Sequence, residues 1–196
     1  MKIVQNTSNI LVIDEVFERH EADIIISRYE TDSTKLEPED WQVRRTQTLF
    51  LNETANWQNI MQILIQPRIN DIIKLFIESI HPSVWAPDWI DFGFVMSGYQ
   101  PGQECRLHID GADVKNYRGK LYQRMVSISI TLNDSNDGAF QFPAQDVEIS
   151  CRTGRAVIFP SSYTHPHTVA PVKTPRYVLV GWLYHPGTVE EQVKVA

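Results

Sequence analysis

A histidine and an aspartate stand two residues apart in the segment CRLHIDG (105–111), and together they could bind a metal ion. His108 and Asp110 follow a run with strand character. A spacing of two along a strand places both side chains on one face of a sheet. Alone, the pattern His-x-Asp is weak evidence, because it also occurs in surface turns and in polar pairs that bind nothing. A metal site here requires a third ligand from elsewhere in the chain.

The other histidines offer one source for that ligand. Of the six histidines in the chain, three are expected on the surface: His20, His81 and His185. The segment THPHTV (164–169) lies between two runs with strand character, RAVIFP and RYVLVGW. A histidine of this segment could therefore face the His-x-Asp pair across the interior of a β-sheet protein.

Two imidazoles and one carboxylate on one face of an octahedral ion are the ligands of non-haem Fe(II) oxygenases, and they leave three positions open for a co-substrate and O₂. A cysteine-rich set would suit structural zinc, and three histidines with an open position would suit hydrolytic zinc. The residue types thus indicate an iron oxygenase. The alternative from another class is a non-catalytic binding module in which the HID and PHT segments are structural turns.

The first half of the chain contains the longest helical pattern, over residues 57–80. Pro67 lies within it and lacks a backbone donor, so we expect a break or kink there. The proline-rich segment HPSVWAPDW (81–89) cannot continue the helix. Four segments before residue 57 are also predicted. They are a strand over 9–14, a helix over 20–29, an exposed loop over 31–40 and a strand over 43–51.

From residue 90 onward, short β-branched or aromatic runs alternate with Gly, Pro, Asn and Asp. There are seven such runs: IDFGFVMSGY, ECRLHID, RMVSISITLN, GAFQF, VEISC, RAVIFP and RYVLVGWLYH. This spacing predicts a mainly β protein with a jelly-roll (double-stranded β-helix) core over roughly 90–185. N-terminal helices, within roughly 15–82, are expected to cover one face. No repeat or linker interrupts the chain, so we expect one domain over 1–196.

The composition narrows the class of protein. The chain has 196 residues, of which 42% are hydrophobic and 21% charged, and its formal net charge is −6. This charge argues against nucleic acid as a partner. Cys105 and Cys151 are too few for a disulfide framework, and we expect free thiols. The sequence shows neither a signal-peptide pattern nor an apolar run long enough to span a membrane, which predicts a cytoplasmic protein. It makes no prediction of oligomeric state.

Four segments, in this order, carry a resemblance to a known family: YQPGQECRLHID (99–110), RMVSISITLND (124–134), DGAFQF (137–142) and IFPSSYTHPHTVAPVKTPRYVLVGW (158–182). Together they resemble the 2-oxoglutarate- and Fe(II)-dependent dioxygenases, in the prolyl-hydroxylase-like branch. The resemblance extends from about Tyr99 to Tyr184. It implies a jelly-roll dioxygenase whose metal ligands are His108, Asp110 and one histidine of the last segment.

The resemblance also chooses between the two neighbouring histidines. The family's ligand precedes x-Val-x-Pro, which here makes His167 the ligand and leaves His165 behind it or at the rim. Arg176, nine residues after His167, is similar to the family's anchor for the distal carboxylate of 2-oxoglutarate. A guanidinium independently suits this role, because it binds a carboxylate through two charge-assisted hydrogen bonds. The alternative for Arg176 is a salt bridge with one of the chain's own acids.

Further residues take roles from the same resemblance. Tyr99 is expected to line the co-substrate pocket, and Ser129 and Thr131 to face it from one strand, although one branch of the family has a tyrosine in place of Thr131. Trp182 is expected close to the site. Two segments depart from the family pattern. DGAFQF lacks the family's acidic residue, and GADVKNYRGKLYQR (111–124) has no clear counterpart. We take residues 111–124, like 31–42, as a candidate mobile loop on the substrate side.

The function that the resemblance implies is hydroxylation of a C–H bond with release of succinate and CO₂. Fe(II), 2-oxoglutarate and O₂ are its cofactor and co-substrates, and ascorbate is an expected auxiliary. The substrate indicated first is a prolyl residue in a protein or peptide, and the alternative is a free amino acid or another small molecule. Asp110 argues against a halogenase, because those enzymes keep the carboxylate position free for chloride. A cupin-like metal enzyme without 2-oxoglutarate is a further alternative, and it would tolerate loss of Arg176.

Overall fold

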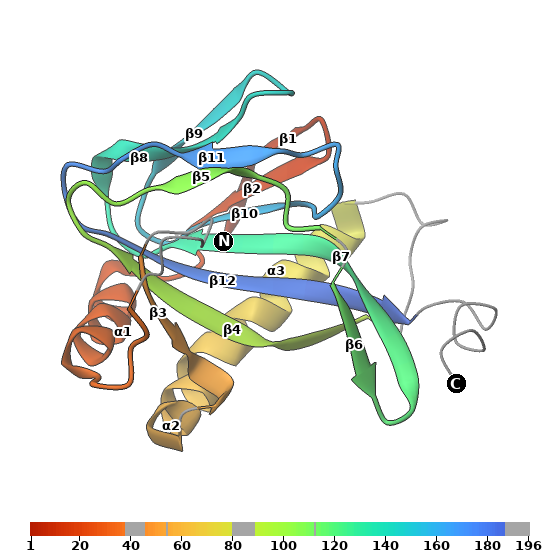
Figure 1. The fold of residues 1–196 in the computed structure, drawn as a ribbon, viewed down its shortest axis with the longest axis horizontal. Helices are drawn as coiled ribbons and strands as arrows, with labels where there is room; N and C mark the ends of the chain where they lie inside the picture. Colours follow the sequence, from red (N-terminus) through yellow and green to blue (C-terminus); the bar gives the residue numbers. More distant parts are fainter. Residues whose placement is uncertain (38–45, 54, 80–88, 112, 187–196) are drawn as a thin grey trace.

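Two antiparallel β-sheets face one another, and helices cover the outer face of the larger sheet (Figure 1). The computed structural model describes residues 1–37, 46–53, 55–79, 89–111 and 113–186. This arrangement is the predicted jelly roll with N-terminal helices. Expectations that fall on residues 38–45 and 80–88 lie outside the described part of the chain.

The strands of each sheet come from distant parts of the sequence. In the larger sheet the order is β1 (Lys2–Thr7), β2 (Ile10–Asp14), β10 (Arg155–Pro160), β7 (Lys120–Thr131), β12 (Arg176–Pro186), β4 (Ile90–Tyr99) and β3 (Gln47–Phe50), and β6 (Val114–Tyr117) pairs with β7. In the smaller sheet the order is β5 (Cys105–His108), β11 (His167–Val169), β8 (Ser135–Phe142) and β9 (Val147–Cys151).

Strand β7 shows why the sheets stack as they do. It lies between β10 and β12, and its last six residues are buried. Successive side chains of a strand point to opposite faces. Ile128 and Ile130 therefore join the core under the helices, whereas Ser127 and Ser129 face the smaller sheet and line a pocket there. The alternating SISIT pattern thus places polar groups between the two sheets.

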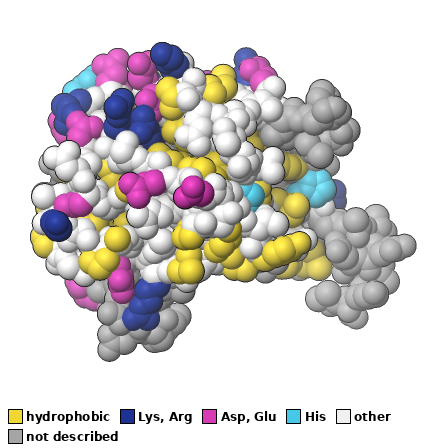
Figure 2. Space-filling model, turned by 90° about the horizontal axis from the view of Figure 1, so that it is seen from above, with side chains coloured by type: hydrophobic (Ala, Val, Ile, Leu, Met, Phe, Trp, Pro, Cys, Tyr) yellow, Lys and Arg dark blue, Asp and Glu magenta, His cyan; other side chains and the backbone are white. Residues whose placement is uncertain are grey.

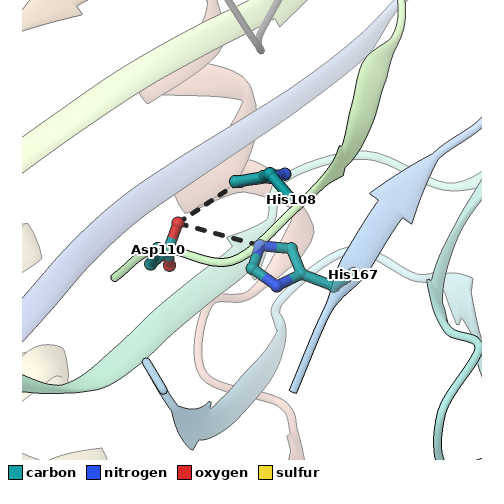
Figure 3. Close-up of side chains that lie close together, drawn as sticks. All are labelled: His108, Asp110 and His167. Atoms are coloured by element: carbon teal, nitrogen blue, oxygen red, sulfur yellow. Dashed lines mark ion pairs between the residues drawn. The ribbon is translucent and has the colours of Figure 1, made fainter. Parts of the chain in front are cut away.

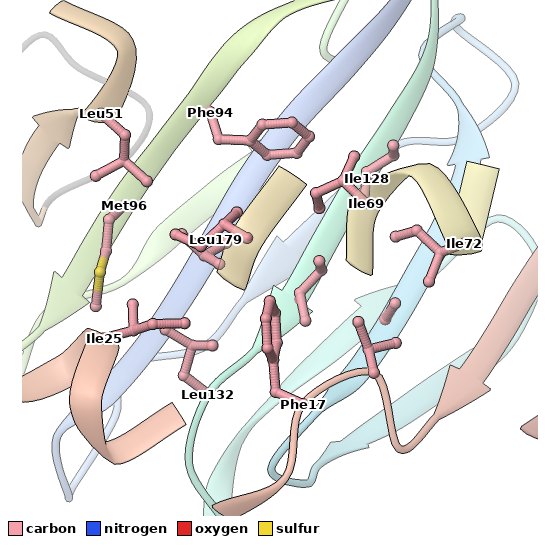
Figure 4. Packing of buried hydrophobic residues seen from close by; sticks show 14 of the residues in the cluster. Phe17, Ile25, Leu51, Ile69, Ile72, Phe94, Met96, Ile128, Leu132 and Leu179 are labelled. Atoms are coloured by element: carbon pink, nitrogen blue, oxygen red, sulfur yellow. The ribbon is translucent and has the colours of Figure 1, made fainter. Parts of the chain in front are cut away.

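Helices α1 (Arg19–Thr31) and α3 (Gln66–Ser79) pack on the other face of the larger sheet. Ile69, Ile72 and Phe76 of α3 recur at helical spacing and are buried. Figure 4 shows Ile69 and Ile72 against strand residues such as Ile128 and Leu179. This packing confirms the prediction that helices cover one face of the sheet.

Pro67 does not interrupt the long helical segment. The short helix α2 (Gln58–Ile60) leads into a π-helical turn, Met61–Ile65, and α3 then continues to Ser79. Proline has no N–H for a helical hydrogen bond, and its ring needs space next to the preceding turn. A widened π-helical turn satisfies both requirements, because its bonds skip one more residue than those of an α-helix. The helix therefore does not break at Pro67, and the helix type changes just before it instead.

Three strands were missed in the sequence pattern: β1, β6 and the three-residue strand β11. Strand β1 is mostly exposed and carries little apolar alternation. Residues 111–124, expected as a mobile loop, include β6 and the start of β7, which form a hairpin. Its turn residues Arg118 and Gly119 both have positive φ, 52° and 76°, as tight hairpin turns require. An arginine in such a position is unusual, and the turn was therefore not recognised.

The surface and the cysteines agree with the composition. On the face shown in Figure 2, acidic and basic side chains are interspersed rather than gathered into one field of a single sign. Within the described ranges, no helix has both the length and the apolar character needed to cross a membrane. Cys105 and Cys151 are both buried, and neither forms a disulfide within the described ranges, as predicted.

Candidate metal centre

His108, Asp110 and His167 converge between the two sheets. Strands β5 and β11 are antiparallel neighbours, and His108 lies directly opposite His167. Asp110 follows β5 and turns back toward both rings (Figure 3). Its Oδ1 atom lies 3.3 Å from Nε2 of His108 and 3.8 Å from Nε2 of His167. One candidate ligand atom from each residue lies within 4.8 Å of the others, which is compact enough for one ion.

Backbone carbonyls fix which nitrogen of each ring faces the site. Nδ1 of His108 lies 2.8 Å from the carbonyl oxygen of Arg106, and Nδ1 of His167 lies 3.0 Å from that of His165. A carbonyl only accepts hydrogen bonds, so each Nδ1 must carry the hydrogen and donate it. In the neutral rings each Nε2 atom then carries a lone pair that can bind a cation, and both Nε2 atoms lie near Asp110. Metal-binding histidines are commonly oriented in this way.

The second carboxylate oxygen of Asp110 is held by the larger sheet. Its Oδ2 accepts hydrogen bonds from the Ser127 hydroxyl at 2.5 Å and from the Trp182 indole N–H at 3.0 Å. Ser127 and Trp182 lie opposite one another on β7 and β12, so both side chains reach the same side of the sheet. Ser127 also contacts the Ser161 hydroxyl at 2.7 Å. Oδ1 is thereby left to face the two histidines.

Burial and charge together set the protonation of the site. Burial alone would lower the pKa of His108, but the hydrogen bond to Asp110 and the nearby Cys105 outweigh it and raise the pKa to about 9. Burial opposes ionisation of Asp110, yet His108, His167 and the donors Ser127 and Trp182 hold the pKa of this carboxyl well below its usual value. A cation that binds here would displace the proton of His108.

Aromatic rings make a dry wall around His167. The ring centroids of Phe140, Phe142 and Phe159 lie 5.2, 5.8 and 4.8 Å from that of the imidazole. Phe140 and Phe142 point inward from β8 and Phe159 from β10, and all three are buried. Water is excluded on this side of the triad, which strengthens electrostatic interactions there.

A pocket leads from the triad to Arg176. It is narrow, with a cavity volume of about 30 Å³, and Arg176 lies at its inner end. Arg176, Val178 and Val180 are alternate residues of β12 and line the pocket, and Trp182 continues the same series to Asp110. Arg176 is only 2% exposed. No acid of the described ranges forms an ion pair with it, which argues against a structural salt bridge.

The remaining predicted residues are distributed around this pocket. Tyr99 lies opposite Arg176 on β4, and it lines the pocket together with Ser129. Thr131 shares the face of Ser129 and is buried, but it is not among the lining residues. His165 turns its ring away from the triad, with Nε2 at 2.8 Å from the carbonyl oxygen of Ser8. It supports His167 through its own carbonyl only.

Arg124 is a residue that sequence reasoning missed. Its guanidinium donates to the Asp110 carbonyl oxygen at 2.9 Å and lies 4.2 Å from the centre of the Trp182 ring. It also donates to the Asp113 carboxylate and the Tyr184 hydroxyl. Arg124 thus fixes both the backbone of Asp110 and the indole that bonds its carboxylate. It lies in the RMVSISIT run, but no spacing rule links an arginine there to Asp110.

A second hollow adjoins the triad on the side of Trp182. Aromatic and basic side chains line much of it: Phe50, Phe92, Trp182, Tyr184, Lys115 and Arg124. The rings of Phe92 and Tyr184 meet edge to face, with centroids 4.9 Å apart. Trp182 lines this hollow and also donates a hydrogen bond to Asp110, so it separates the hollow from the triad.

Comparisons with known proteins agree with this geometry. Residues 94–184 match a family described as the 2OG-Fe(II) oxygenase superfamily. A search of curated protein sequences finds no match to the chain.

Three solved structures share the fold at low identity. Viral collagen prolyl hydroxylase from Paramecium bursaria Chlorella virus-1, in its 2OG complex, has a TM-score of 0.69 and 16% identity, covering 92% of this chain and 98% of that one. A Trichoplax adhaerens prolyl hydroxylase, in complex with a peptide fragment of hypoxia inducible factor, has a TM-score of 0.68 and 14% identity, covering 97% and 89%. A Pseudomonas putida prolyl-4-hydroxylase has a TM-score of 0.64 and 22% identity, covering 92% and 95%.

Proposed function

The chain belongs to the 2OG-Fe(II) oxygenase superfamily, and from this premise we propose that it hydroxylates a prolyl residue of a protein or peptide substrate. One pocket carries the proposal. The triad of His108, Asp110 and His167 lies at its mouth, and Arg176 lies buried at its inner end without an acidic partner in the described ranges. An iron ion and a dicarboxylate are the two groups that these ends suit.

His108, Asp110 and His167 would hold Fe(II) through two Nε2 atoms and one carboxylate oxygen. The donor set fits the ion, because two imidazoles and one carboxylate are the facial ligands of non-haem iron oxygenases. The hydrogen bonds behind the ligands fit it too: each Nδ1 is bound to a carbonyl, and Oδ2 of Asp110 is bound to Ser127 and Trp182. Such outer contacts orient ligands before the ion arrives.

Arg176 would bind the distal carboxylate of 2-oxoglutarate. A buried guanidinium without an anionic partner is costly, so an anionic ligand in this pocket would be strongly favoured. The Tyr99 and Ser129 hydroxyls are nearby hydrogen-bonding groups that line the same pocket. The valines and phenylalanines between the two ends provide an apolar channel for the carbon chain of the co-substrate.

Bound iron, 2-oxoglutarate and O₂ together supply the oxidation that converts a substrate C–H bond to C–OH, with release of succinate and CO₂. The protein's part is to orient and to exclude water. Phe140, Phe142 and Phe159 keep one side of the triad dry. Arg124 and Trp182 keep Asp110 in place.

The aromatic hollow next to Trp182 supports a peptide substrate with a prolyl residue. Phe92, Trp182 and Tyr184 offer flat faces on which a pyrrolidine ring can pack, and aromatic side chains are common in grooves that bind proline-rich peptides. Several solved structures of similar fold are prolyl hydroxylases, one of them with a peptide bound. Ascorbate as an auxiliary, a cytoplasmic location and a single domain over the whole chain stay predictions.

Mass spectrometry tests the proposal. The protein is incubated with Fe(II), 2-oxoglutarate, ascorbate and proline-containing peptides, beside matched peptides with alanine in place of proline and a separate reaction with free amino acids. We expect succinate, together with proline peptides that gain the mass of one oxygen atom. If succinate forms but only free amino acids are oxidised, the peptide substrate is wrong. If succinate never forms and anaerobic addition of Fe(II) and 2-oxoglutarate gives no visible charge-transfer band, the dioxygenase itself is wrong.

Replacing Trp182 with phenylalanine is expected to weaken metal binding about tenfold, since outer-shell partners of a ligand typically contribute that much. The substitution keeps a ring on Arg124 but removes the hydrogen bond to Asp110. A competition titration of Co(II) against a chelator measures the effect. Trp89→Phe is the matched control, because the Trp89 indole N–H has no hydrogen-bond partner in the described part of the chain. Equal Co(II) affinity in Trp182→Phe and the parent protein would contradict this role.

A further inference from the structure

Cys151, the last residue of β9, contacts the guanidinium of Arg176 without lining the pocket. Its Sγ atom accepts a hydrogen bond from Arg176 Nε at 3.4 Å and donates one to the Gly138 carbonyl oxygen at 3.1 Å. Cys151 is buried. Because the thiol hydrogen is engaged with the carbonyl, the sulfur lone pairs are left to accept from Nε–H.

Gly138 makes room for the same arginine. A Cβ atom at this position would lie 2.9 Å from Cδ of Arg176 and 2.9 Å from Cγ1 of Val172. Gly138 also has a φ of +70°, a conformation that favours glycine. It lies where the register of β8 and β9 shifts, between Ser135 and Phe140. The DGAFQF segment, which departs from the family pattern, thus packs against the side chain of Arg176.

The third contact is with an aromatic face. The Arg176 guanidinium carbon lies 5.2 Å from the centre of the Tyr99 ring, within the range of a cation–π interaction. Cys151 contacts Nε, Gly138 lies next to Cδ, and the Tyr99 ring faces Cζ. Together these contacts fix the position and the plane of the Arg176 guanidinium. The two Nη groups then carry the remaining donors, in the fork geometry that matches a carboxylate.

We propose that Cys151 is a positioning residue for Arg176 and that it sets the chain length of the 2-oxo dicarboxylate that the pocket accepts. This inference rests on the proposed function, in which Arg176 binds the distal carboxylate. The number of carbons fixes the distance between the metal-binding end of such an acid and its far carboxylate. A guanidinium held at one depth favours one length. Without the sulfur, Arg176 can retract, and the six-carbon 2-oxoadipate competes better with the five-carbon 2-oxoglutarate.

Isothermal titration calorimetry on the full chain loaded with Mn(II) tests this without turnover. The Kd is measured for 2-oxoglutarate and for 2-oxoadipate. In Cys151→Ala we expect the Kd for 2-oxoglutarate to rise about fivefold, the size of one modest hydrogen bond. The preference over 2-oxoadipate should fall by a similar factor. Cys151→Ser, which keeps a donor and an acceptor, should recover most of both. Ile149→Val, a buried change two residues earlier on β9, should leave both Kd values unchanged.

The outcomes separate this inference from the proposed function. If the parent protein binds neither acid, the proposed function fails. If the parent binds 2-oxoglutarate but Cys151→Ala keeps the same Kd and the same preference, only the role of Cys151 is overturned. Equal losses in Cys151→Ser and Cys151→Ala would also overturn it, because the volume of the side chain and not its hydrogen bonds would then hold Arg176. A thermal melt of each variant verifies that the fold is retained.

Discussion

Replacing Asp110 with alanine is expected to weaken Fe(II) binding more than about 100-fold, beyond the usual effect of an outer contact, and to abolish succinate formation. Asp110 supplies the one carboxylate of the triad, and its Oδ1 atom faces both imidazoles. The alanine variant keeps two neutral nitrogen ligands and loses the charge that offsets the cation. Metal affinity is measured by competition with a chelator, and turnover by succinate released from 2-oxoglutarate.

Two further variants sharpen this test. Asp110→Asn keeps the shape of the side chain but not its charge, so a loss of affinity in this variant identifies charge as the cause. Asp71→Ala removes an exposed acid from α3 and should leave metal binding and turnover unchanged. If Asp110→Ala bound Fe(II) as tightly as the parent protein, Asp110 would not be a ligand, and the binding-module alternative would gain support.

The jelly roll could be predicted because strands β7 and β12 are buried on both faces, and such burial requires a recognisable pattern of residue types. Both strands carry β-branched and other apolar residues over much of their length, since each is covered by helices on one side and by a sheet on the other. The segments that could not be predicted lack this residue pattern. Strand β1 is an exposed edge, and the β6 hairpin depends on positive φ at Arg118, which the residue type does not signal.

The residues of the candidate site also fall into two groups, those that could be predicted from the sequence and those that could not. Residues that bind through their own chemistry, such as His108 and Arg176, are recognisable by type and spacing. Residues that support them are defined by contacts between strands far apart in the chain. Arg124 reaches Asp110 only because β7 runs beside the loop after β5, and Cys151 reaches Arg176 across 25 residues of sequence. Ser127 shares its strand face with Ser129, but nothing in the sequence assigned it a contact with Asp110.

Replacing Arg176 with glutamine is expected to raise the Kd for 2-oxoglutarate about 100-fold, since truncating one partner of a buried charge pair costs about 2–5 kcal/mol. The neutral amide keeps hydrogen-bonding groups near the inner end of the pocket but cannot offset a carboxylate charge. Arg176→Lys keeps the charge and loses the fork of two Nη donors, so its Kd should fall between the two. Titration of the Mn(II)-loaded protein gives these values.

Comparing the binding of two ligands shows whether Arg176 binds the distal carboxylate or only stabilises the fold. 2-Oxopentanoate has the carbon chain of 2-oxoglutarate without the far carboxylate. The parent protein should prefer 2-oxoglutarate strongly, and Arg176→Gln should bind the two acids about equally. Arg152→Ala, which removes an exposed arginine next to the end of β9, should keep the parent's preference. A preference that survives in Arg176→Gln would assign the distal carboxylate to another residue, and unchanged turnover in that variant would favour the cupin-like alternative.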